Sequence, residues 1–214
     1  MIGRYSEVLH IGVTHNLFDC HISEFITEFM ERHHDIAVRI SIAHSEEIIS
    51  SLGTSDYDIV FIYYPYQHHN YICEQFVSDQ IILATSVVNA KHKAGISHDK
   101  MLELPIIYSP LFFTSEGYDW VFPSHYVYPL SINVVSKVVP FLKTGKWYCL
   151  LPRQIIAKEL EDGSLIEIPL LGIDLTKKKS YMIYKYIKGN HRKTDAIHKL
   201  VDMLKETLLT KTAG

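Results

Sequence analysis

The first third of the chain alternates between helix-like and strand-like patterns of apolar residues. The short apolar run LHIGV is followed by a segment in which apolar residues recur at i, i+3, i+4, i+7 and i+8, the spacing of one helix face. The run IAVRISI then alternates in the manner of a strand, and YDIVFIYY is nearly continuous, as expected of a strand buried on both faces. Between these two runs, HSEEIISSL offers Ser45 as a helix cap with Glu46 and Glu47 in the first turn. The pattern predicts the order β-α-β-α-β over residues 9–64.

This order of elements has a structural consequence. Connections of the β-α-β kind give parallel strands with right-handed crossovers. Ligands of such sheets bind outside the carboxyl ends of the strands. We therefore expect binding residues in the turns that follow the predicted strands.

The rest of the chain predicts a second α/β block. Its elements are strands at 81–88, 104–108, 126–135, 147–151 and 165–170, and helices at 97–102, 115–122, 136–143 and 153–160. A final strand at 180–187 and a helix capped by Thr194 have no obvious partner in that block, so we expect the chain to return to the first lobe. The predicted lobes are 8–84 plus 180–210 and 85–179, with 1–7 as a linker or remnant. Two-lobed folds of this kind bind small molecules between the lobes and close by hinge motion.

Composition narrows the function classes. The 214 residues are 47% hydrophobic and 21% charged, with a formal net charge of −3, which is ordinary globular composition and does not favour a nucleic-acid surface. No apolar run approaches the ~18–20 residues of a membrane helix. Three scattered cysteines fit a reducing cytoplasm, and the adjacent histidine pairs point apart in a helix or strand, so we expect neither a metal site nor a cofactor.

Several motifs, taken in order, resemble the effector-binding domain of LysR-type transcriptional regulators. The matching segments are LHIGVTHN, EFITEFMERHHDIAVRISIAHSEEIISSL, YDIVFIYYP, NVVSKVVPFLKTGKWYCLLP, KELEDGSLIEIPL and TDAIHKLVDMLKETL. The resemblance spans about residues 8–209 and implies two Rossmann-like lobes around a central cleft, as in type 2 periplasmic-binding-protein-like folds. Two departures affect the second lobe. Trp147 stands where the family has the second glycine of Gly-x-Gly, and Pro140 lies inside the preceding helix.

The resemblance also implies what the domain works with. We expect a small-molecule effector, a homodimer (a tetramer in the full-length protein) and DNA contact only through an N-terminal winged helix-turn-helix that this sequence lacks. The chain would then be a cytoplasmic regulatory fragment without a membrane partner.

The candidate effector-binding residues follow predicted strands or begin predicted helices. Thr14 and Asn16 either cap the first helix or bind a ligand, and the same two roles are open to Ser45. The ligand would be a small metabolite, anions included, held by hydroxyls and backbone N–H groups. The full set is Thr14, His15, Asn16, Ser45, Tyr63, Tyr64, Tyr108, Ser109, Thr114, Asn133 and Ser136.

Two other function classes fit the sequence less well. A free-standing solute-binding protein of a transporter shares the two-lobed physics, and a signal peptide or lipobox would favour it; neither is visible. An enzyme is disfavoured because the chain has no GxGxxG, GxxxxGK[ST] or GxSxG motif.

Overall fold

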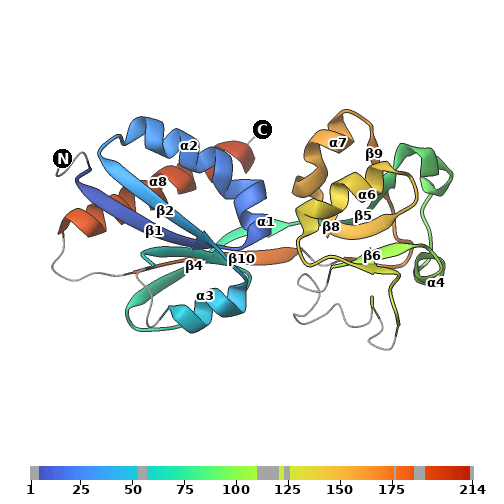
Figure 1. Cartoon of the computed structure of the whole chain (residues 1–214), viewed down its shortest axis with the longest axis horizontal. Coiled ribbons are helices and arrows are strands. Elements are labelled where there is room, and N and C mark those ends of the chain that lie inside the picture. The colour runs from blue at the N-terminus through green and yellow to red at the C-terminus, as the bar shows by residue number, and fades with distance from the viewer. Residues whose placement is uncertain are drawn as a thin grey trace. The chain divides into compact units, whose positions relative to one another are not determined.

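The computed structural model describes residues 5–52, 57–109, 121–122, 126–175, 177–185 and 191–212. The chain forms two compact units, each built on one five-stranded sheet. Unit 1 comprises Met1–Val77 and Lys179–Gly214, and unit 2 comprises Ser78–Lys178 (Figure 1). The division falls before the predicted boundary at Ala84 because the strand that begins at Ile81 pairs entirely within unit 2.

The sheet of unit 1 has the order β2-β1-β3-β10-β4. Strand β1 pairs in parallel with β2 and β3, as the β-α-β-α-β pattern predicts, whereas β10 pairs antiparallel to β3. The strands are β1 (Glu7–Val13), β2 (Ile36–Ile42), β3 (Ile59–Ile62), β4 (Tyr71–Asp79) and β10 (Lys178–Lys185).

Helices cover both faces of this sheet (Figure 1). Residues of α2 (Ser23–Arg32) and α8 (His191–Thr212) form one core with β1, and residues of α3 (Ser45–Ser51) form a second core on the other side. Strand β3 contributes to both, since Ile59 and Phe61 belong to the first core and Val60 and Ile62 to the second. This is why its sequence is a continuous apolar run. Helix α8 begins at His191, before the predicted cap Thr194.

The first helix begins earlier than the apolar spacing predicts. The helical segment comprises α1 (His15–Leu17), a π-helical turn η1 (Phe18–Ile22) and then α2. Leu17 and Ile22 are both fully buried in the same core, and their spacing of five matches the i→i+5 repeat of a π-turn. The wider turn therefore lets α1 (His15–Leu17) join the helix while the apolar face of the helix stays on the sheet.

The sheet of unit 2 has the order β7-β6-β8-β5-β9. Strand β6 runs parallel to β7 and β8, and β5 runs antiparallel to β8 and β9. The strands are β5 (Ile81–Ser86), β6 (Ile106–Tyr108), β7 (Leu130–Ser131), β8 (Tyr148–Pro152) and β9 (Leu165–Ile168). The short helices are η2 (Val87–His92), α4 (His98–Leu102), η3 (Val135–Val138), α6 (Val139–Lys143), η4 (Arg153–Ile156) and α7 (Ala157–Glu161).

Four predicted strands of unit 2 were too long, and two of them, predicted at 104–108 and 165–170, are each two residues shorter, at Ile106–Tyr108 and Leu165–Ile168. The strand predicted at 81–88 ends at Ser86, because Val87 and Val88 start η2 and are exposed. The strand predicted at 126–135 shrinks to β7, and the helix predicted at 115–122 lies largely outside the described residues. Pro140 causes no break, since it sits in the first turn of α6, where its missing N–H has no helical partner to lose. Gly145 ends that helix with φ of 76°.

Candidate functional site

The predicted residues of unit 1 gather where its parallel strands end. The backbone N–H of Thr14, just after β1, donates to Phe61 of β3 at 3.2 Å, and the N–H of Ala43, just after β2, donates to Val13 at 3.1 Å. The His15 and His44 rings lie 6.0 Å apart, between centroids. We call this group, Thr14–Asn16, His44–Ser45 and Tyr63, the strand-end site.

Thr14 is buried at the strand-end site without serving as a side-chain cap. It occupies the N-cap position of α1 with extended backbone angles, φ −75° and ψ 151°, yet its side chain makes no capping hydrogen bond. The residue is 5% exposed, and within the described part of the chain its Oγ1 has no hydrogen-bond partner. Of the two roles the sequence left open, capping by the hydroxyl is therefore wrong.

Asn16, the second residue of α1, shows the same property. It is 7% exposed, and its buried Oδ1 has no hydrogen-bond partner among the described residues. A buried carbonyl oxygen without a donor costs free energy, so such groups call for an explanation. The strand-end site thus holds two unsatisfied oxygens two residues apart.

Ser45 does not cap α3, contrary to the prediction. The N-cap position belongs to His44, whose side chain makes no capping bond, and Ser45 is the first helical residue. The Ser45 Oγ instead accepts the backbone N–H of Tyr63 at 3.3 Å. The Ser45 hydroxyl therefore holds the end of β3 against the start of α3. His44, which was not among the predicted site residues, occupies the N-cap position after β2.

The two tyrosines after β3 are both half-buried but differ in surroundings. Tyr63 packs against the core shared by β1 and α2. The Tyr64 hydroxyl donates to Glu46 Oε1 at 3.2 Å. Tyr63 therefore lies closer to the interior of the strand-end site than Tyr64.

In unit 2, the predicted residues Tyr108 and Ser109 follow β6. Ser109 is fully buried, and its Oγ has no hydrogen-bond partner within the described ranges. The Tyr108 ring stacks on Tyr128 with centroids 4.7 Å apart and planes at 14°. Burial, with smaller contributions from Tyr108 and Tyr126, raises the pKa of Tyr128 to about 12. Tyr128 was not predicted, although the aromatic run before β7 is visible in the sequence.

The remaining predicted residues of unit 2 are less enclosed. Asn133 is exposed and Ser136 is half-buried within η3, so neither has the unsatisfied interior group seen in Ser109. Thr114 lies outside the described residues.

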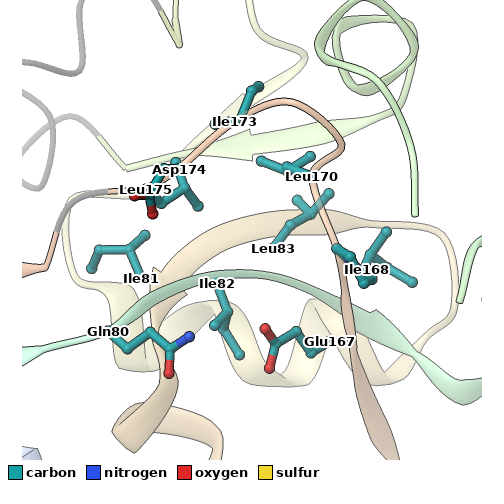
Figure 2. A pocket seen from close by; sticks show the side chains of 11 residues that line it. Gln80, Ile81, Ile82, Leu83, Glu167, Ile168, Leu170, Ile173, Asp174 and Leu175 are labelled. Carbon is teal, nitrogen blue, oxygen red and sulfur yellow. The ribbon is translucent and has the colours of Figure 1, made fainter. Parts of the chain in front are cut away.

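Unit 2 also contains a separate pocket of about 150 Å³ over β5 and β9 (Figure 2). The segment from Leu170 to Leu175 arches over it, and aliphatic side chains from both strands line it. None of the predicted site residues contributes to it. Arg153, which follows β8, is exposed and pairs with Glu167 at this pocket at 2.5 Å, which makes it a surface residue of unit 2.

The described residues contain neither a metal-ligand cluster nor a helix that could span a membrane. Within those ranges, no three His, Cys, Asp or Glu side chains are grouped as metal ligands. No helix there is long and apolar enough to cross a bilayer. The strand-end site presents hydroxyl, carboxamide and imidazole groups.

Comparison with solved structures gives the same fold at low sequence identity. The BenM effector-binding domain with its effector benzoate is 13% identical, with a TM-score of 0.69 and coverage of 97% of this chain and 95% of that chain. The AphB regulatory domain from Vibrio vulnificus is 18% identical, with a TM-score of 0.69 and coverage of 94% and 98%. A full-length OxyR variant from Pseudomonas aeruginosa is 12% identical, with a TM-score of 0.69. The match covers 95% of this chain and 66% of that chain.

The family model described as LysR substrate binding domain matches residues 3–209. No curated protein sequence matches the chain. The predicted two-lobed, periplasmic-binding-protein-like fold is confirmed by these matches, which do not favour the alternative of a transporter's solute-binding protein. With nearly its whole length matched, this chain belongs to the family of LysR substrate-binding domains, the ligand-sensing regulatory domains of LysR-type transcriptional regulators.

Proposed function

We propose that a small-molecule effector binds at the strand-end site of unit 1 and that the Thr14 hydroxyl contacts it directly. One observation carries the proposal: Thr14 Oγ1 is buried at the carboxyl end of β1 and, among described residues, has no partner. Leaving a buried hydroxyl unsatisfied costs about 1–3 kcal/mol. A ligand that supplies the missing hydrogen bond would recover this free energy on binding.

The neighbours of Thr14 support a polar ligand. His15 and His44 flank it, and each neutral imidazole offers one donor and one acceptor. In unit 2, Ser109 remains a predicted contact residue, and its fully buried Oγ has no hydrogen-bond partner among the described residues. A contact with the effector remains a prediction for the other candidate residues: Tyr63, Tyr64, Tyr108, Thr114, Asn133 and Ser136.

The domain would act by binding rather than by catalysis. An effector that binds one conformation more tightly than another shifts the population between them, and the size of the shift equals its differential affinity. LysR-type regulators bind small-molecule effectors and exist as oligomers, so this shift would be transmitted through the assembly.

The direct test is a thermal-shift screen of small metabolites on the protein and on Thr14→Val. An effector at 100 times its Kd adds about 2.7 kcal/mol. For a domain of this size we expect a rise in Tm of roughly 5–10 °C. Valine keeps the shape of threonine and suits the extended backbone at this position, so Thr14→Val should fold. We expect the variant to unfold with a free energy about 1 kcal/mol higher, because the unsatisfied hydroxyl is gone. Its affinity for the effector should be about tenfold lower, because the hydrogen bond to the ligand is lost.

Thr85→Val provides the matched control. Thr85 is also fully buried, but its hydroxyl donates to the Trp147 carbonyl at 2.8 Å and accepts from Asn89 at 2.8 Å. Its loss should lower the unfolding free energy by about 1–3 kcal/mol and leave effector affinity unchanged. Equal affinity in wild type and Thr14→Val would show that Thr14 does not contact the effector.

We also propose that the domain forms a homodimer. Strand β2 is an edge strand whose Ile42 is 40% exposed, and Met30 of α2 is 41% exposed. Exposed apolar edge strands favour pairing with another chain. Sedimentation equilibrium should show a dimer that Ile42→Lys weakens; a monomer at all concentrations would contradict the proposal.

A further inference from the structure

Strand β9 pairs with only part of β5, and the pocket of unit 2 lies where the two strands separate. Their pairing ends at Leu83 and Ile168. Continued by two residues, the same register would bring Leu170 opposite Ile81. The pocket of about 150 Å³ lies there instead, and both Leu170 and Ile81 line it (Figure 2).

A bridge to another segment of unit 2 explains the separation. Leu170 forms a parallel bridge with Ile96. The Ile96 N–H donates to the Pro169 carbonyl at 2.9 Å, and the Leu171 N–H donates to the Ile96 carbonyl at 2.8 Å. Because backbone groups alternate in direction along an extended segment, the N–H of Leu170 faces the opposite way, toward β5.

The separation leaves the backbone of Ile81 facing the pocket. At one end of β5, the Val87 N–H donates to the Ser164 carbonyl on the β9 side at 3.2 Å. At the other end, the Arg153 N–H on the β8 side donates to the Gln80 carbonyl at 2.9 Å. Odd-numbered residues of β5 therefore turn their N–H and C=O toward β9, and even-numbered residues turn theirs toward β8. Ile81 is 3% exposed, and among the described residues no backbone hydrogen bond joins it to the segment 169–175.

The charged and apolar groups of the pocket define the rest of its chemistry. Two carboxylates line it, and Glu167 is already paired with Arg153 at 2.5 Å. Asp174 lies on the segment that arches over β5 (Figure 2), and no Lys or Arg is among the lining residues. The pocket therefore favours a positive group beside Asp174. Its other side chains are mainly aliphatic: Ile81, Leu83, Ile168, Leu170, Ile173 and Leu175.

We infer that this pocket binds a small aliphatic α-amino acid, at a site separate from the strand-end site. The ammonium group pairs with Asp174 and donates to the Ile81 carbonyl. The carboxylate accepts the N–H groups of Ile81 and Leu170, and the side chain packs against the aliphatic walls. Cavities of about 150 Å³ hold molecules of the size of benzene, which limits the ligand to amino acids near alanine and valine in size.

The position of the pocket in the chain gives the site a regulatory role. Residues 80–83 follow the first passage of the chain from unit 1 to unit 2, at Ser78, and residues 173–175 precede its return, at Lys178. A bound amino acid would therefore join the two segments that connect the units.

The test is a titration of the ¹⁵N-labelled protein with L-valine, followed by NMR of the backbone amides. Isovalerate, which lacks the amino group of valine, and isobutylamine, which lacks its carboxylate, are titrated beside it. We expect valine to shift the amide resonances of Ile81 and Leu170. Each analogue should bind about tenfold more weakly or worse, because it loses the charge-assisted hydrogen bonds at one end.

A pair of matched variants tests the ammonium contact. Asp174 is exposed outside the core, so Asp174→Asn should fold. Its affinity for valine should fall about tenfold, whereas its affinity for isovalerate should not fall, because isovalerate carries no ammonium group. The control Asp99→Asn removes another exposed carboxylate of unit 2, one that does not line the pocket, and should bind valine like wild type.

Three results would overturn the inference. The first is an absence of amide shifts at Ile81 and Leu170 up to the solubility limit of valine, including the case in which only Thr14–Asn16 shift. The second is equal affinity for valine and its two analogues, and the third is unchanged affinity in Asp174→Asn. None of these results bears on effector binding in Thr14→Val, so the pocket and the strand-end site can fail separately.

Discussion

Two buried oxygens of the strand-end site, Thr14 Oγ1 and Asn16 Oδ1, have no hydrogen-bond partner among the described residues. The hydroxyl of Thr85, which is also buried, bonds both Trp147 and Asn89. Residue type does not distinguish the two groups, since each contains small polar side chains. Their hydrogen-bond partners do, which makes Thr14 and Asn16 candidates for contact with a ligand.

Tyr128 permits a prediction about alkaline pH. An unfolded tyrosine has a pKa of about 10, whereas burial raises the pKa of Tyr128 in the folded chain to about 12. Above pH 10 the unfolded chain loses this proton first. The contribution of Tyr128 to the unfolding free energy is therefore complete below pH 10 and is lost as the pH rises through about 12.

Tyr128→Phe should consequently reduce the alkaline loss of stability. Burial also raises the pKa values of Tyr71, Tyr148 and Tyr184, so part of the loss should persist in the variant. Urea unfolding at a series of pH values from 8 to 12 measures the slope. A slope identical to that of wild type would contradict the role given to Tyr128.

At the scale of elements, the apolar pattern was a good guide wherever burial against a sheet or between helices decided it. Strand β3 and helix α2 lie where their apolar patterns predict, because burial against a sheet imposes those patterns. The prediction was wrong where a contact distant in sequence decides the local structure. Ser45 looks like a cap, but the end of β3 supplies a backbone N–H that its hydroxyl accepts instead.

The candidate site was predictable to a similar extent. The rule that ligands bind at carboxyl ends of strands led to Thr14, Asn16 and Ser109. It could not reveal that their oxygens have no partners, because that depends on how the whole interior packs. The same rule applied to the strand 36–42 would have added His44.

Two glycines that end helices give an element-scale prediction. Gly145 and Gly163 both have positive φ, at 76° and 73°, so alanine costs about 1–2 kcal/mol at either position. A Cβ on Gly145 would also lie 2.4 Å from Val88 Cγ2, whereas one on Gly163 would have no neighbour within 4 Å among the described residues. Thermal unfolding should therefore show a larger loss for Gly145→Ala, about 2–3 kcal/mol, because Val88 must move. Equal losses would show that Val88 yields without cost.

At the scale of the whole molecule, the return of the chain to unit 1 follows from the sequence, because the last strand and helix lack partners in the second block. The structure assigns β10 and α8 to unit 1. What the sequence pattern does not reveal is where β10 enters. It lies inside the sheet, between β3 and β4, and runs antiparallel to β3.

That position has a consequence for synthesis on the ribosome. Strands β1 to β4 emerge first, but the place between β3 and β4 stays vacant until all of unit 2 has been translated and β10 follows. The nascent chain therefore carries two unpaired strand edges around an apolar core, the kind of surface that chaperones recognise and that aggregates when left open. A message cut short after unit 2 would yield a polypeptide that contains every residue of the strand-end site and still could not complete the sheet that holds it.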